Sequence, residues 1–255
     1  MERSKGSLNS LMKRTNWQKW VLVTDTHGNE INEECSKAFL KFCDEYSPDV
    51  RIHGGDVFDF KALRNGASAD DKAASMEDDF VAGRKFLREY FVGDCKKVLT
   101  FGNHDYRIFA NQKSSNATVA YAAYKGSEEI TKLTNDLGVE TLPYHIKDGR
   151  YQMGDATFIH GFECSMAGLK REAMTNPTQF TFQGHIHSDE RICTPAGTLQ
   201  ACPAMCNLVM PYNETRSATL RHTNGWIAGA MNTKTGEHVY SIAQNINNQW
   251  VCPTI

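Results

Sequence analysis

The sequence predicts an α/β protein whose second half is rich in strands. Two observations predict this class. In the first half, short apolar runs alternate with segments whose apolar residues recur at helical spacing. After about residue 140, short apolar runs follow one another with little helical pattern between them. A chain of 255 residues can form one large domain, which we place at 19–255, behind an N-terminal extension at 1–18.

The elements of the first half alternate between strand and helix. Asn32 is a suitable N-cap, and the two glutamates that follow it suit the first turn of a helix. Gly138 suits the left-handed position just beyond a helix end. The predicted elements are a strand at 20–24, a helix from Asn32 to about Tyr46, a strand within 49–55, a helix across roughly 70–91, a strand within 96–103 and a helix at 127–138.

The second half contains short strands without an internal repeat or a linker. Each strand is an apolar run of a few residues between polar or glycine-containing turns. The predicted strands lie around 141–147, 156–160, 179–183, 190–194, 226–231 and 238–243.

Charge and composition exclude several classes of protein. The formal net charge of −2 and the pI near 6.5 provide no basic field for a nucleic acid or an anionic membrane. No apolar run approaches the ~18 residues of a membrane span, and the N-terminus has no apolar core of a secretory signal. The eight cysteines are scattered, which favours free thiols in a reducing cytoplasm.

Metal-capable side chains follow five apolar runs, usually beside glycine. Residues i and i+2 of an extended segment point to the same side, so Asp25 and His27 are expected to project together. Ligands gather at the carboxyl ends of strands in α/β sheets, so five such blocks predict one metal site at this edge. The blocks are Asp25-Thr26-His27, Gly54-Gly55-Asp56, Gly102-Asn103-His104-Asp105, His160-Gly161 and Gly184-His185-Ile186-His187.

These blocks resemble the five signatures of the calcineurin-like metallophosphoesterases, and the resemblance covers about residues 20–190. It implies a sandwich of two mixed β-sheets flanked by helices (αββα) and a site for two metal ions. It also implies that Asp56 bridges the two ions and that His104 faces the phosphate without binding metal. The implied ligands are Asp25, His27 and His187 for the first ion, and Asn103, His160 and His185 for the second.

The residue types suit the hydrolysis of phosphate esters. Two cations about 3.5–4 Å apart can neutralise the phosphate and hold a bridging hydroxide. Imidazole, carboxylate and amide ligands suit manganese, our first expectation, or iron, zinc or nickel. His104 is predicted to donate a proton to the leaving oxygen, and Asp105 is predicted to orient the His104 imidazole. Asp59 is predicted to steer a ligand.

The signatures also narrow the range of possible substrates. The phosphoprotein-phosphatase branch typically carries G-D-x-x-D-R-G and G-N-H-E, whereas this chain has Phe60-Lys61 after Asp59 and closes its third block with Asp105. The chain is more similar to the branch of exonucleases and small phosphodiesterases. We therefore predict a phosphodiesterase or nuclease acting on nucleic acid or a nucleotide-type substrate. The alternatives are a phosphomonoesterase and, remotely, a protein-binding scaffold that has lost its metal ligands.

Other residues carry weaker predictions. Arg64 and Arg107 follow signature blocks and are candidates for phosphate contact. The segment 107–135 is predicted to cover the site as a lid. Glu163 could lie on the rim of the site or contact the substrate, and His53 is expected to pack behind it. The remaining histidines, which are expected to be structural or exposed, are His145, His222 and His238.

Overall fold

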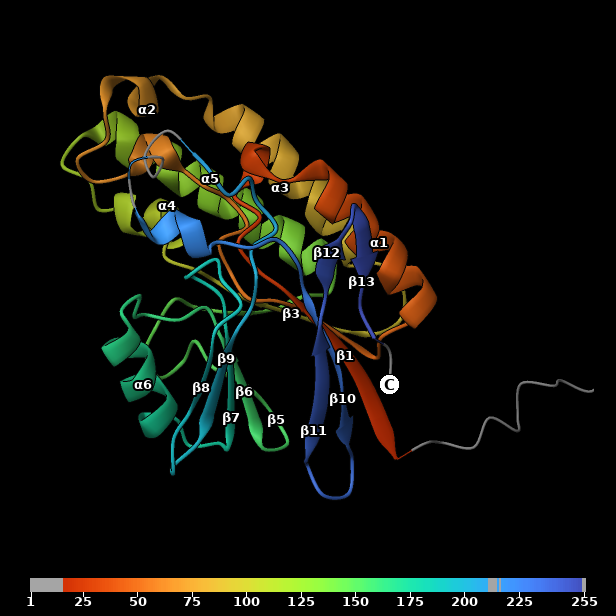
Figure 1. Cartoon of the computed structure of the whole chain (residues 1–255). Helices are drawn as coiled ribbons and strands as arrows, with labels where there is room; N and C mark the ends of the chain where they lie inside the picture. Colours follow the sequence, from red (N-terminus) through yellow and green to blue (C-terminus); the bar gives the residue numbers. More distant parts are fainter. Residues whose placement is uncertain (1–15, 211–214, 216, 254–255) are drawn as a thin grey trace, which may run out of the picture.

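The structure, a computed structural model, describes residues 16–210, 215 and 217–253. Two mixed β-sheets pack face to face, and helices cover the outer face of each sheet (Figure 1). The architecture is therefore the αββα sandwich that the sequence predicts. None of the described helices combines the length and the apolar character that a membrane span requires.

The first sheet has six strands in the order β11-β10-β1-β2-β3-β4. Neighbours from β1 to β4 run parallel, whereas β10 and β11 pair antiparallel at the other edge. The strands are β1 Trp17–Val23, β2 Val50–His53, β3 Lys96–Thr100, β4 Glu140–Leu142, β10 Ile227–Asn232 and β11 His238–Ile242.

The second sheet has five strands in the order β5-β6-β7-β9-β8. Its three central strands are parallel, and both edge strands are antiparallel to their neighbours. The strands are β5 Tyr151–Met153, β6 Ala156–Ile159, β7 Phe180–Gln183, β8 Arg191–Cys193 and β9 Thr198–Ala201; a separate hairpin contains β12 Gln244–Ile246 and β13 Gln249–Val251.

Helices α1, α3 and α5 cover the first sheet, and α6 covers the second (Figure 1). The helices are α1 Glu33–Tyr46, α2 Ala69–Ala73, α3 Met76–Tyr90, α4 Tyr106–Asn111, α5 Ala117–Asp136 and α6 Met166–Thr175, with short 3-10 turns at Gly28–Glu30, Lys61–Leu63 and Ser217–Arg221.

The alternation of β1 residues joins the two cores. Val21 and Val23 face the helices, whereas Trp20 and Leu22 face the second sheet. The Trp20 ring lies 5.0 Å from Phe158 and 4.9 Å from Phe182 (centroid distances), in edge-to-face contacts. These buried aromatic rings hold the two sheets together and thereby fix the relative positions of their strand ends.

Helix α1 begins as the sequence predicts. The Asn32 side chain accepts a hydrogen bond from the Cys35 N–H at 3.0 Å, and its amide donates to Asn224 at 3.2 Å. The predicted apolar face of the helix lies against the core, with Phe39 fully buried. The Asn32 side chain therefore both caps the helix and ties it to the segment before β10.

Several predicted boundaries differ from the structure. The helix expected across 70–91 is two helices, because Ser75 caps the start of α3 with its side chain. Helix α5 begins at Ala117 rather than at 127, and it ends with Gly138 in the expected left-handed conformation. The strand expected at 141–147 ends at Leu142, and β5, β9, α4, α6 and the β12–β13 hairpin were not predicted.

The predicted lid segment, 107–135, forms α4 and most of α5. Ile108, Ala123 and Ile130 from these helices are buried in the main core, so the segment is packed against the sheet. Its role in covering the site stays a prediction. Strand β1 begins at Trp17, inside the extension expected at 1–18, and residues 1–15 lie outside the described residues.

Candidate functional site

Two strand-end loops of the first sheet are joined by backbone hydrogen bonds beyond the ends of β1 and β2. The N–H of Asp25 donates to the carbonyl of Gly55 at 2.9 Å, and the N–H of His27 donates to the carbonyl of Asp56 at 3.0 Å. A third loop joins them where the His185 N–H donates to the Asp25 carboxylate at 3.0 Å. The predicted blocks therefore meet at one edge of the sandwich, as expected.

The backbone at this edge is left-handed at non-glycine residues, and this conformation aims the side chains. Positive φ angles between 50° and 73° occur at five of the metal-ligand candidates, namely Asp25, His27, Asp56, His185 and His187. The sequence prediction that Asp25 and His27 project together is correct, but its stated cause is wrong. Strand β1 ends at Val23, and both residues have a left-handed rather than an extended backbone.

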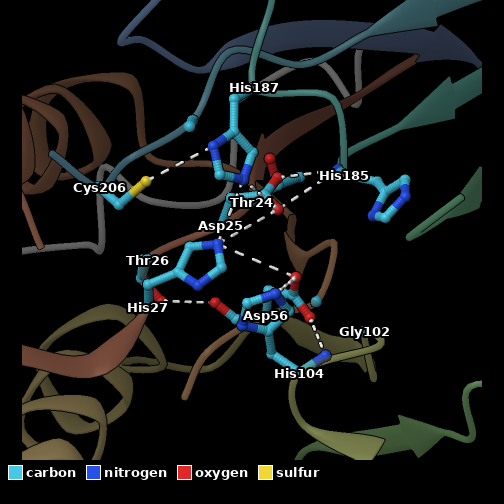
Figure 2. Close-up of polar contacts among 12 residues, drawn as sticks. Thr24, Asp25, Thr26, His27, Asp56, Gly102, His104, His185, His187 and Cys206 are labelled. Carbon is cyan, nitrogen blue, oxygen red and sulfur yellow. Dashed lines mark hydrogen bonds and ion pairs between the residues drawn. The ribbon is translucent and has the colours of Figure 1, made fainter. Parts of the chain in front are cut away.

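The candidates for the first ion lie close together (Figure 2). The Nε2 atoms of His27 and His187 are 3.2 Å apart, and Asp25 Oδ1 lies 3.3 Å from His187 Nε2 and 3.8 Å from His27 Nε2. All three side chains are buried. The structure therefore brings together the three residues predicted for this ion.

The candidates for the second ion form a neighbouring cluster. His160 Nε2 lies 2.9 Å from Asn103 Oδ1 and 3.3 Å from Asp56 Oδ2. Asp56, His160 and His185 form one group whose ligand atoms lie within 4.8 Å of one another. All seven predicted ligands thus belong to two adjoining clusters.

Asp56 lies between these clusters. Its Oδ2 is 3.9 Å from His27 Nε2, 3.3 Å from His160 Nε2 and 3.9 Å from His104 Nε2. Burial alone would raise the pKa of Asp56, but the neighbouring histidines, His160 foremost, hold it well below its usual value. Burial alone would lower the pKa of His160, but the charge of Asp56 raises it to about 9. The buried carboxylate therefore favours positive charge on both sides.

The Nδ1 atoms of His27 and His160 point to acceptors outside the clusters, which leaves their Nε2 atoms facing the centre. His160 Nδ1 donates to the Gly54 carbonyl at 2.9 Å, and His27 Nδ1 donates to Asp59 Oδ1 at 3.2 Å. A carbonyl only accepts, so the proton of neutral His160 must reside on Nδ1. The Nε2 lone pair then remains available for a cation, which is the usual arrangement around metal-bound histidine.

Asp59 orients His104, and the prediction that Asp105 does so is wrong. His104 Nδ1 lies 2.6 Å from Asp59 Oδ1. The Asp105 carboxylate is occupied by the backbone, accepting from Gly102 N at 2.9 Å and from Phe58 N at 3.0 Å. Burial and the Asp56 charge raise the pKa of Asp105 to about 7. Asp105 therefore holds two loops together, and Asp59 steers both His104 and His27, as predicted for a ligand-steering residue.

Cys206 is a residue of the site that sequence reasoning missed. Its Sγ lies 3.9 Å from His187 Nδ1, and it forms with His27 and His187 a further group that could hold a metal ion (Figure 2). Burial raises the pKa of this thiol to about 12. The only signal in the sequence was the C-x3-C spacing with Cys202, and that spacing does not indicate contact with a histidine. All eight cysteines are free.

The two arginines predicted to contact substrate both have partners within the protein. Arg107 Nη1 donates to the Asp59 carbonyl at 2.6 Å, so Arg107 lies beside the His104–Asp59 pair. Arg64 pairs with Asp71 of α2. Glu163 pairs with Arg171 at 2.9 Å on the exposed side of α6. The structure brings Arg107 to the site, whereas it pairs Arg64 with a residue of α2 and Glu163 with a residue of α6.

His53 packs behind the site, as expected. Its Nδ1 accepts from the Gly55 N–H at 3.2 Å and its Nε2 lies 3.2 Å from the Thr26 hydroxyl, so it joins the two strand-end loops. Burial lowers the pKa of His53 to about 3, which keeps the ring neutral. His238 is buried beside Met153 and His145 is exposed, whereas the His222 ring lies 5.1 Å from the His187 ring.

Asp79 on α3 supports Asp59 from behind. Its carboxylate accepts from the backbone N–H of Asp59 at 3.0 Å and of Phe60 at 2.6 Å, and burial raises its pKa to about 6. This carboxylate fills the space beside Gly28, where an added Cβ would lie 1.6 Å from Asp79 Oδ1. The glycine after His27 is therefore required for the approach of Asp79.

Comparison with protein families identifies the chain. The model of the calcineurin-like phosphoesterases matches residues 19–188, about two-thirds of the sequence. The protein therefore belongs to the calcineurin-like phosphoesterase family, a family of hydrolases that act on phosphate esters. It has clusters of His and Asp side chains that could hold metal ions. A search of curated proteins finds no match.

Solved structures share the fold at low sequence identity. Vacuolar protein sorting 29 from Cryptosporidium parvum is 12% identical, with a TM-score of 0.50 over 93% of this chain and 96% of that chain. An archaeal phosphodiesterase and the phosphoesterase Yfce from E. coli are also each 12% identical with TM-scores of 0.46. They cover 88% and 92% of this chain, and 99% and 97% of their own chains. Similarity at this level shows the fold alone.

The packing of Asp79 against Gly28 leads to a stability prediction. Gly28→Ala should lower the free energy of unfolding by at least about 2 kcal/mol more than Gly93→Ala, because the Asp79 carboxylate would have to leave two backbone donors. Gly93 also has a positive φ, of 77°, but nothing lies within 4 Å of an added Cβ. Its substitution should therefore cost only the ~1–2 kcal/mol of left-handed backbone.

Urea unfolding in the presence of EDTA measures both variants without a contribution from metal binding. Equal losses of stability in the two variants would show that Asp79 moves aside without cost.

Proposed function

We propose that the protein is a binuclear metal-dependent phosphodiesterase that acts on nucleic acid or on a nucleotide-type substrate. The observation that carries this proposal is the position of Asp56. One buried carboxylate lies within 4 Å of histidines from both clusters, as a ligand shared by two cations requires. A buried carboxylate needs compensating charge, and the position of Asp56 between His27 and His160 is explained if cations in both clusters provide that charge.

The donor set fits two divalent transition-metal ions. Asp25, His27 and His187 would hold one ion, Asn103, His160 and His185 would hold the other, and Asp56 would contact both. Mixed nitrogen and oxygen donors suit manganese, iron, zinc or nickel. When bound, the ions would offset the charge of the phosphate and activate the attacking water.

The residues of the chain itself have separate tasks in this proposal. The Nδ1 contacts of His27 and His160 keep their Nε2 atoms inward before a cation binds. His104 lies at the edge of the cluster, with its Nδ1 on Asp59 and its partly exposed ring facing the space near Asp56. From there its Nε2 is positioned to give a proton to the leaving oxygen of the ester.

The signature around Asp56 and Asp59 supports a diester rather than a monoester as substrate. A phosphate monoester carries a second negative charge, which phosphatases commonly bind with a guanidinium group. In this chain Phe60 follows Asp59 at the position where the phosphoprotein-phosphatase signature has an arginine. A diester carries a single charge and does not need such a partner.

The first prediction from the proposed function concerns metal content. Protein reconstituted with Mn²⁺ should hold about two ions per chain by elemental analysis. Asp56→Asn should retain fewer than one ion per chain, because the neutral amide lacks the negative charge that would hold both ions. Asp155→Asn, a carboxylate beside His238, is the control and should retain both ions. Two ions in Asp56→Asn would show that the bridging role is misassigned.

The second prediction compares ester types. At equal concentration, bis-p-nitrophenyl phosphate should be hydrolysed faster than p-nitrophenyl phosphate, because the signature after Asp56 lacks the D-R-G arginine that would bind the second charge. Initial rates with the same Mn²⁺-loaded preparation measure the ratio. A clear preference for the monoester would favour a phosphomonoesterase instead.

The third prediction concerns His104. A sugar alkoxide needs a proton as it leaves, whereas nitrophenolate barely needs one. His104→Asn should therefore lose roughly 10²–10⁴-fold activity on a dinucleotide and much less on bis-p-nitrophenyl phosphate. Its metal content should match the wild type, as should that of the control His238→Asn, which alters a buried histidine outside the clusters.

Two outcomes would contradict this role. His104 belongs to a group that could hold a metal ion with His27 and Asp56, so loss of metal in His104→Asn would make it a ligand. An equal loss on both substrates would mean that the imidazole stabilises the phosphoryl charge rather than donating a proton.

A further inference from the structure

Three aromatic side chains lie in contact on the rim of the metal-ligand clusters. Tyr106, Tyr144 and Phe162, the rim aromatics, come from three different strand-end segments. Tyr106 follows the Gly102–Asp105 block, Tyr144 follows β4, and Phe162 follows the His160–Gly161 block. The Tyr144 ring lies 4.9 Å from the Phe162 ring and 6.0 Å from the Tyr106 ring (centroid distances).

The rim aromatics begin at the ligand cluster itself. The Tyr144 ring lies 5.9 Å from the His160 ring, at an interplanar angle of 72°. His160 Nε2 is in turn 3.3 Å from Asp56. A continuous series of rings therefore leads from the proposed phosphate site toward solvent.

The exposure of these rings is not explained by packing. The aromatic residues between the sheets, such as Trp20, Phe158 and Phe182, are fully buried. By contrast, Tyr106 is 47% exposed, and Tyr144 and Phe162 are only partly buried. Partly exposed rings in mutual contact beside a reactive centre provide faces on which a planar group can stack.

We propose that the rim aromatics form a stacking subsite for the nucleobase of a nucleotide-type diester. This inference rests on the proposed phosphodiesterase function and narrows its substrate class. A phosphate bound near Asp56 would place its ester substituents beside His160, and a nucleotide carries its base one sugar away from the phosphate. The formal net charge of −2 gives no basic field for tracking a long polyanion, so a small nucleotide ester is the favoured ligand.

A pair of substrates with one leaving group tests the proposal. The p-nitrophenyl ester of thymidine 5′-monophosphate has a base, and methyl p-nitrophenyl phosphate does not. In Tyr144→Ala, the ratio of kcat/KM for the thymidine ester over the methyl ester should fall roughly 5- to 100-fold, the effect of losing one base stack. Tyr144→Phe should keep most of the ratio, because it keeps the ring.

Tyr121→Ala is the matched control. Tyr121 is a tyrosine of α5 that is 66% exposed and lies outside the rim aromatics, so this variant should keep the wild-type ratio. An unchanged ratio in Tyr144→Ala would overturn the proposal. Equal losses of kcat/KM on both esters would also overturn the proposal, because they would show that the rings contact the nitrophenyl leaving group rather than the base.

A binding measurement separates this proposal from the proposed function. By calorimetry, Mn²⁺-reconstituted protein should bind adenosine 5′-monophosphate about tenfold or more tightly than ribose 5-phosphate, and Tyr144→Ala should remove most of the difference. This result would hold even if the protein did not hydrolyse diesters. Equal affinities in the wild type would exclude a base subsite, whatever the activity.

Discussion

The left-handed backbone at five ligand candidates is the constraint on which the site depends. Each such residue costs about 1–2 kcal/mol, so the five together would destabilise an isolated loop considerably. The surrounding structure offsets this cost. The Asp25 and His27 N–H groups are bonded across to the Asp56 loop, and each loop continues directly from a buried parallel strand. Because of these hydrogen bonds, the loops cannot turn their side chains outward without losing the backbone contacts that join them.

A second layer of contacts gives the imidazoles one orientation. Asp59 accepts from the Nδ1 atoms of both His27 and His104, and Asp79 accepts from the Asp59 backbone. Burial would raise the pKa of Asp59, but the His104 and His27 hydrogen bonds hold it far below its usual value. A permanently charged Asp59 therefore orients a ligand candidate and the candidate proton donor together. A substitution at Asp59 would disturb both metal binding and proton transfer. A substitution at His104 should disturb proton transfer and leave metal binding unchanged.

The fold class and the five metal-capable blocks could be predicted from the sequence, because an apolar run and the residue after it are local features. The seven ligand candidates within these blocks are what the family resemblance implies. The sequence was insufficient where a contact joins distant segments. Asp105 is the neighbour of His104 in the chain, yet Asp59 reaches the His104 ring because the segments after β2 and β3, two neighbouring strands, lie beside each other. Cys206 arrives beside His187 through the segment after the second sheet, with no local pattern to indicate it. Helix α5 was predicted too short because its first buried residue is Ala123, so its first turns present no buried apolar face.

Assembly of the two sheets and formation of the site are the same event. Asp25 and Asp56 come from the first sheet, whereas His160 and His187 come from the second. Neither sheet carries a complete set of ligands, so the clusters exist only when the sheets are packed through Trp20 and the aromatic rings opposite it. Because cations would bind only the packed form, their binding should stabilise the sandwich as a whole by mass action. Two contributions would then offset the strain of the left-handed loops. One is the core between the sheets, and the other is the binding of cations to the side chains that these loops present.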